Sequence, residues 1–153
     1  MVLIVKAEHL NIICDRAQET YPEECCGLLL GRESHGETEL IEVWPTENHW
    51  NAESTNFDPT DLTKERRYAI DPKEMLRVQK QGRDRGLNII GIYHSHPDNP
   101  AIPSECDREY AWPEYLYIIV SVPKGYPTDI YCWSLDQEHQ FQPEQFKVSR
   151  KSE

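Results

Sequence analysis

Two short apolar runs constrain the fold of this chain more than any other feature of its sequence. They cover residues 26–31 (CGLLLG) and 88–93 (NIIGIY), and glycines or turn residues bound both of them. Runs of this length are too short for a core helix, but they fit strands that are buried on both faces, as in a sheet covered by helices. We therefore expect a central sheet with helices packed on its faces.

The remaining segments supply the elements that such a sheet requires. Apolar side chains recur at helical spacing over residues 10–21, and Pro22 ends that pattern. Asp71-Pro72, with Glu74 three residues after the aspartate, is typical of a helix start and predicts a helix over residues 72–85. Further strands are predicted at residues 2–5, 39–44, 116–122 and 130–135, and a short helix from residue 104 to near 113. The predicted fold class is α/β, a mixed β-sheet with flanking helices.

The chain length favours a single domain, residues 1–153, since no repeat or shift in composition divides it. Residues 46–64 are polar and follow neither the helical nor the strand period, which predicts a long surface loop. Residues 147–153 are expected to form a short, charged C-terminal tail.

Charge and composition exclude several classes of partner. The net charge of −11, without a Lys/Arg stripe, repels a phosphate backbone and argues against nucleic acid. No segment approaches the roughly 20 apolar residues that cross a bilayer, and Lys6 and Glu8 interrupt the first apolar stretch before it resembles a signal peptide. The five cysteines form no C-x-x-C pair, as is usual for reduced thiols. We expect a soluble, cytoplasmic protein.

The chemically distinctive residues begin where the second apolar run ends. His94 and His96 are two residues apart, and side chains at this spacing point to the same side of a strand. Asp107 follows Ser104 in the pattern S-x-x-D, which puts a carboxylate on the first turn of a helix. Two histidines and one aspartate form the open ligand set of a catalytic zinc site, which keeps a fourth position for water. Glu24, just before the first apolar run, is the best candidate for the carboxylate that accepts a proton from this water.

The ordered set Glu24, His94-Ser95-His96-Pro97 and Ser104-x-x-Asp107 resembles the JAMM (MPN-plus, Mov34) metalloprotease family, and the resemblance spans residues 2–135. It implies a fold similar to that of cytidine deaminases, Zn²⁺ bound by His94, His96 and Asp107, Glu24 as general base and acid, and Ser104 as donor to the developing oxyanion. The family spacing selects Glu24 rather than Glu23.

The segment 107–121 looks like that of the compact bacterial members, which act with small ubiquitin-like sulfur carriers. One group of these, the Mec type, releases cysteine from the C-terminal glycine of the carrier. The resemblance thus implies a zinc metallopeptidase that hydrolyses the (iso)peptide bond after the C-terminal glycine of a ubiquitin-like or sulfur-carrier protein, whose tail is its partner.

Two other functions and several structural interpretations stay open at this point. The chain could be a non-catalytic MPN-type scaffold, although its ligand set is complete, or a DNA-associated protein of the RadC type, against which the acidic charge argues. Ser104-x-x-Asp107 alone is a plain capping box. Cys25, Cys26 and Cys106 are expected to pack rather than react or bind metal, whereas Trp50 is a candidate clamp for a substrate tail.

Overall fold

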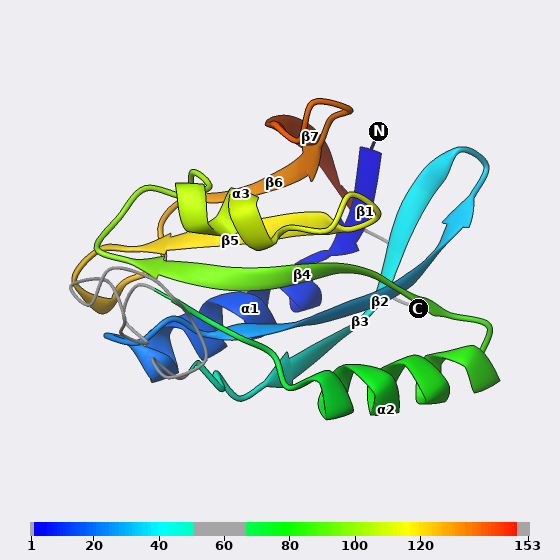
Figure 1. Cartoon of the computed structure of the whole chain (residues 1–153), viewed down its shortest axis with the longest axis horizontal. Coiled ribbons are helices and arrows are strands. Elements are labelled where there is room, and N and C mark those ends of the chain that lie inside the picture. Colours follow the sequence, from blue (N-terminus) through cyan, green and yellow to red (C-terminus); the bar gives the residue numbers. More distant parts are fainter. Residues whose placement is uncertain (1, 51–66, 150–153) are drawn as a thin grey trace.

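The computed structural model describes residues 2–50 and 67–149, and within them seven strands and three α-helices form one mixed barrel (Figure 1). The strands are β1 (Val2–Lys6), β2 (Cys26–Ser34), β3 (Glu37–Thr46), β4 (Asn88–Pro97), β5 (Leu116–Val122), β6 (Ile130–Leu135) and β7 (Phe141–Ser149). The helices are α1 (Ala7–Thr20), α2 (Pro72–Asp84), α3 (Glu105–Tyr110) and the 3-10 turn η3 (Pro123–Gly125). None of the helices in these residues is long and apolar enough to cross a membrane.

The strand order around the barrel is β1-β3-β2-β4-β5-β6-β7, and β1 also pairs with β7. The β4–β5, β1–β3 and β1–β7 pairs are parallel, and the others are antiparallel. This arrangement confirms the predicted mixed sheet with flanking helices. The sequence did not predict that the sheet closes on itself.

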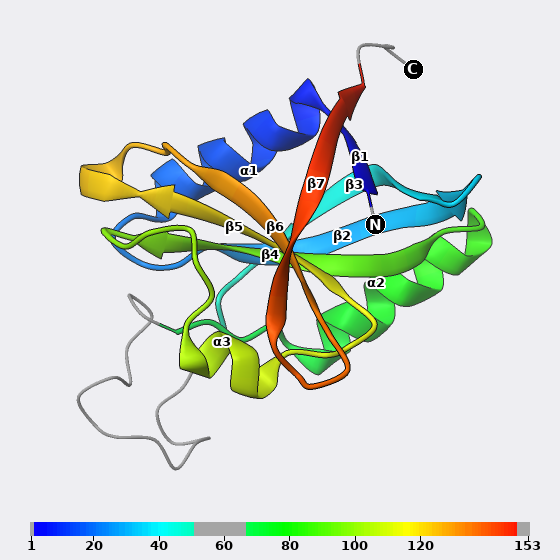
Figure 2. The same cartoon turned by 90° about the horizontal axis from the view of Figure 1, so that it is seen from above.

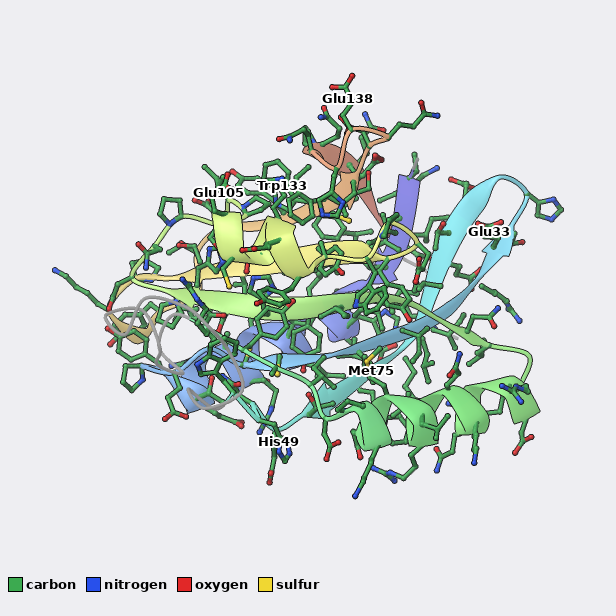
Figure 3. All side chains as sticks on the ribbon, viewed as in Figure 1. Glu33, His49, Met75, Glu105, Trp133 and Glu138 are labelled. Atoms are coloured by element: carbon green, nitrogen blue, oxygen red, sulfur yellow. The ribbon has the colours of Figure 1, made fainter. Side chains whose placement is uncertain are left out.

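The central strands are buried on both faces, as their apolar composition predicts. Leu28 and Leu30 of β2 pack in one cluster with Val78 of α2, and Leu29 packs in another cluster with Ile13 of α1. Figure 2 shows α1 on one side of these strands and α2 and α3 on the other. The side chain of Met75 lies between α2 and the sheet (Figure 3).

Local signals set several element boundaries correctly. His35 and Gly36 both have positive φ, which is the backbone of the tight hairpin turn between β2 and β3. The Asp71 side chain accepts a hydrogen bond from the Lys73 backbone N–H and caps α2 at the predicted start.

The C-terminal part of the chain differs from the prediction. β7 was not predicted, and it extends through Ser149, so the expected tail at residues 147–153 begins inside a strand. β7 is half-exposed and rich in polar residues, so it lacks the apolar run that revealed the central strands. The predicted loop at 46–64 starts where β3 ends, at Thr46, but residues 51–64 lie outside the described part of the chain.

Candidate metal centre

Strand β4 aims two imidazoles at the same place. His94 and His96 point toward α3, since both imidazoles contact the carboxylate of Asp107, while Ser95 between them points to the opposite side of the strand. Ser95 is tied to the start of β2, because its backbone N–H donates to the Cys25 carbonyl at 3.2 Å and its Oγ accepts from the Cys25 N–H at 2.8 Å. These bonds hold Glu24, the residue before Cys25, close to the histidines.

Helix α3 supplies the carboxylate. Ser104 caps this helix by a reciprocal pair of hydrogen bonds: its Oγ accepts from the Asp107 N–H at 3.1 Å, and its own N–H donates to Asp107 Oδ2 at 2.9 Å. The predicted capping box therefore exists, and it fixes the Asp107 carboxylate toward the end of β4.

The three side chains converge on one point. His94 Nε2 lies 3.2 Å from His96 Nε2 and 3.3 Å from Asp107 Oδ1, and His96 Nε2 lies 3.0 Å from Asp107 Oδ2. Ligand bonds of 2.0–2.1 Å in a tetrahedral zinc site put neighbouring ligand atoms about 3.3 Å apart. The donor set and its spacing thus fit a zinc ion, and the three residues form a group that could hold a metal ion.

Burial and charge favour the protonation states that bind a metal. Burial lowers the pKa of the fully buried His94, although the Asp107 carboxylate opposes this shift. Burial alone would raise the pKa of Asp107, but the two imidazoles hold the pKa of that carboxyl well below its usual range. A neutral imidazole and an ionised carboxylate are the forms that ligate.

Glu24 lies buried beside the metal ligands. Its side chain is only 4% exposed, and its Oε1 has no hydrogen-bond partner among residues 2–50 and 67–149. Burial, reinforced by the charge of Asp107, raises the pKa of Glu24 well above its ordinary value, although Arg67 opposes the shift. A raised pKa makes this carboxyl a better proton acceptor, as suits a general base that later returns the proton.

A cavity of about 410 Å³ connects the candidate catalytic groups. Glu24, His96 and Ser104 line it together with Arg67, Asn99, Pro100 and Ile102. The proposed base, a metal ligand and the proposed oxyanion donor therefore face one space, in which a scissile amide could contact all three.

A second cavity, of about 340 Å³, lies against another candidate ligand, Asp107, and has several aromatic side chains in its wall. Asp107 and Arg67 contribute to its wall, along with Trp50, Tyr68, Met75, Tyr110, Trp112 and Tyr117. Trp50, which the sequence suggested as a clamp, is thus in the wall of a cavity beside the site. Tyr68 and Arg67 were not predicted from the sequence, where the one signal for them was an aromatic residue in a polar stretch.

The cysteines near the site have the character expected of packing residues. Burial raises the pKa of Cys25 to about 11 and that of Cys26 to about 12, and burial raises the pKa of Cys106 to about 11. These thiols stay protonated at neutral pH and are poor nucleophiles and poor ligands. Cys106 is not part of the group formed by His94, His96 and Asp107.

Comparison with known proteins gives a consistent family. The model of the prokaryotic homologues of the JAB domain matches residues 6–136. A desampylase of Haloferax volcanii is 39% identical over 71 residues, which cover 46% of this chain and 50% of that protein. A CysO-cysteine peptidase of Mycobacterium tuberculosis is 30% identical over 121 residues, which cover 78% of this chain and 73% of that protein.

The fold has a close counterpart among solved structures. The solution structure of a protein from Desulfitobacterium hafniense superposes with a TM-score of 0.78 at 25% sequence identity, over 99% of this chain and 94% of that one. The arrangement of strands and helices is therefore shared by a protein with a quarter of its residues in common.

Proposed function

The chain belongs to the family of prokaryotic homologues of the JAB domain, which confirms the resemblance seen in its motifs, and from this premise we propose that it is a zinc-dependent peptidase. Its substrate is the tail of a ubiquitin-like or sulfur-carrier protein, and it hydrolyses the (iso)peptide bond after the C-terminal glycine of that tail. The observation that carries the proposal is the convergence of His94, His96 and Asp107 beside the buried Glu24.

The names of the relatives support this substrate class. The names desampylase and CysO-cysteine peptidase both describe cleavage of a conjugate of a ubiquitin-like or sulfur-carrier protein. The Mec-type preference for cysteine as the leaving group is the narrower form of the proposal.

We also propose that the fold shares the cytidine deaminase arrangement and that the protein acts in the cytoplasm, where its free cysteines stay reduced.

His94, His96 and Asp107 would hold the zinc ion. When bound, zinc with three protein ligands supplies Lewis-acid activation of water and polarisation of a carbonyl oxygen. Pro100 supports this arrangement, because its carbonyl oxygen lies 2.8 Å from His96 Nδ1 and so turns His96 Nε2 toward the other ligands.

Glu24 transfers the proton. It accepts a proton from the attacking water and then donates it to the nitrogen of the leaving amine, so that the carboxylate is regenerated at the end. The raised pKa of Glu24 supports this role, because the carboxyl must hold the proton between the two steps.

Ser104 stabilises the negative charge that develops on the carbonyl oxygen. Its Oγ accepts from the Asp107 N–H, which leaves the hydroxyl proton available to donate. One such donor contributes about 3 to 4 kcal/mol of transition-state stabilisation.

The carrier tail binds in an extended conformation. Glycine has no side chain, so a glycine-ending tail can approach the backbone closely, as in strand addition. Arg67 lines both cavities, so the two cavities adjoin and together provide room for a tail that extends beyond the scissile bond. Trp50 contributes to the clamp on the tail.

The test combines metal analysis with cleavage of a carrier that ends in a glycyl-cysteine amide. We expect about one zinc per wild-type chain. Glu24→Gln should keep the zinc and lose about 10²- to 10⁴-fold of the rate, while His96→Ala should lose both zinc and cleavage.

The other outcomes separate the alternatives. Zinc without cleavage would contradict the proposed substrate, whereas a wild-type chain that binds no zinc would favour a non-catalytic MPN-type binding module. Equal rates for Glu24→Gln and wild type would remove Glu24 from the mechanism.

A further inference from the structure

The two histidines of the site are held in different ways. Metal-ligating histidines almost always donate their second ring N–H to a hydrogen-bond partner, which fixes the orientation of the ring. His96 has such a partner in the carbonyl of Pro100. His94 Nδ1 has none within residues 2–50 and 67–149, although its side chain is fully buried.

An aromatic ring instead lies on one face of this imidazole. The ring of Tyr68 stacks on the imidazole of His94 with a centroid separation of 4.4 Å and an interplanar angle of 22°. Stacking at this distance restricts the tilt of the imidazole plane and contributes about 0.5 to 1.5 kcal/mol beyond the buried area. The direction of His94 Nε2 is set by β4, the strand that carries His94.

The backbone on both sides of Tyr68 is clamped by one side chain. Asn48 Nδ2 donates to the Arg67 carbonyl at 2.9 Å, and Asn48 Oδ1 accepts from the Ala69 N–H at 3.1 Å. The backbone adds a further bond, from the His49 N–H to the Ala69 carbonyl at 2.8 Å. Tyr68 is therefore fixed although it lies in an irregular segment, before α2.

The same amide also reaches the proposed general base. Asn48 Nδ2 lies 3.2 Å from the carbonyl oxygen of Glu24. One side chain thus links the backbone of Glu24 to the segment that carries the stacked tyrosine.

From these contacts we propose that Tyr68 is a positioning residue for the metal ligand His94, and that Asn48 holds Tyr68 in place. The inference rests on the zinc site of the proposed function. The ring of Tyr68, and not its hydroxyl, performs the role, because the contact is a stack of two planes.

The test measures zinc affinity by competition with a chelator of known affinity, so it does not depend on cleavage. Tyr68→Leu removes the ring and should weaken zinc binding about 10- to 100-fold, the usual effect of losing a partner that orients a ligand. Tyr68→Phe keeps the ring and should retain the wild-type affinity. Asn48→Ala should weaken zinc binding in the same direction as Tyr68→Leu.

Two controls keep the result specific. Trp112→Leu removes another aromatic side chain from the same cavity. Within the described residues the rings that contact His94 are those of Tyr68 and His96 and not that of Trp112, so zinc affinity should be unchanged. The visible spectrum of the cobalt-substituted protein should change in Tyr68→Leu and not in Tyr68→Phe, because it reports the ligand geometry. Tyr68→Met, whose flexible side chain can fill an irregular gap, replaces Tyr68→Leu if the latter fails to fold.

The outcomes distinguish this inference from the proposed function. Wild-type zinc affinity in a folded Tyr68→Leu or Tyr68→Met, or equal losses in the Phe and Leu variants, would overturn the role of the ring while leaving the zinc site intact. A wild-type chain that binds no zinc would overturn both, and a chain that binds zinc but cleaves no carrier would overturn only the substrate.

Discussion

At the scale of single residues, Ser104 combines a structural and a chemical role in one hydroxyl. Its oxygen caps α3 by accepting from the Asp107 N–H, and its proton is free for the proposed oxyanion. In the sequence, the same motif fitted both a capping box and a part of the catalytic site. The geometry makes them compatible, because capping uses a lone pair and oxyanion stabilisation uses the proton.

Substitutions at Ser104 can separate these roles. Ser104→Ala should lower kcat about 10²- to 10³-fold and destabilise the fold by about 1 kcal/mol, because it removes both the donor and the cap. Ser104→Gly should lose as much activity but cost only a few tenths of a kcal/mol, since glycine is tolerated at N-caps. Ser104→Thr should retain both. Steady-state kinetics and denaturant unfolding measure the two effects, and full activity in the glycine variant would exclude the hydroxyl from catalysis.

Glu24 and Glu23 show what a motif adds to residue-level reasoning. Both are carboxylates before β2, and composition alone does not choose between them. Glu24 is buried and lines a cavity together with His96, whereas Glu23 is exposed. The family spacing selected the residue with the environment of a proton-transfer group.

At the scale of elements, the start of α1 depends on a histidine that the sequence analysis assigned no function. His9 Nδ1 accepts from the Lys6 N–H at 3.1 Å, and its Nε2 lies 3.2 Å from the Ile41 carbonyl. Both bonds form only when the imidazole is neutral, with its proton on Nε2. Burial accordingly lowers the pKa of His9, although the Ile41 carbonyl and Glu8 oppose the shift.

This geometry predicts a pH-dependent helix start. Because the folded-state pKa of His9 is below its unfolded value of about 6.5, its contribution to stability is complete above that value and is lost as the pH falls toward the folded-state pKa. His9→Ala should cost about 1 kcal/mol at pH 7.5, and the gap to wild type should shrink at pH 5. The glutamine in His9→Gln accepts the same hydrogen bond without titrating, so the difference in the free energy of unfolding between His9→Gln and His9→Ala should not change with pH. Urea unfolding at several pH values tests this, and a wild-type gap that does not change with pH would contradict it.

The pairing of β4 with β5 requires a glycine. A Cβ at Gly91 would meet the Leu116 carbonyl oxygen, which belongs to the backbone and cannot move without separating the two strands. Gly91→Ala should therefore destabilise the fold by about 1 to 3 kcal/mol, as overpacking does. It should also weaken zinc binding, because the same strand carries His94 and His96.

The matched control for Gly91→Ala is Asn88→Ala, an exposed position on the same strand, which should change stability by less than about 0.5 kcal/mol. Thermal unfolding and metal content of both variants measure the effects. Gly91→Ala with wild-type stability would show that β4 and β5 tolerate the added carbon.

At the scale of the whole molecule, the sequence revealed the elements that carry strong local signals and missed what depends on distant contacts. The apolar runs of β2 and β4 and the cap of α2 could be predicted because each signal lies within a few residues. The grouping of His94, His96 and Asp107 could be predicted because the motif fixes their order. Tyr68 and Asn48 could not, because their roles arise from the path of irregular segments that no periodicity describes.

The missed strand β7 has the same explanation. It pairs with β1 in parallel, from Val2 opposite Gln145 to Lys6 opposite Ser149, so its partner lies at the other end of the chain. Phe146 is its partly buried residue that packs against the core shared by α1 and the central strands. A strand whose stability depends on such a distant pairing has little local sequence signal.

Closure of the barrel by β7 should therefore stabilise the whole fold and not only the strand itself. Phe146→Ala removes a core contact at the middle of the β1–β7 pair and should lower the free energy of unfolding by about 2 kcal/mol, less than the 3 to 5 kcal/mol of a fully buried phenylalanine. Gln145→Ala, on the exposed side of the same strand, should be nearly neutral. Amide hydrogen exchange distinguishes global from local opening. If β7 is part of the cooperative core, Phe146→Ala should accelerate exchange in β1 and in β4 alike. Faster exchange confined to β7 would show that the barrel opens there without unfolding the rest.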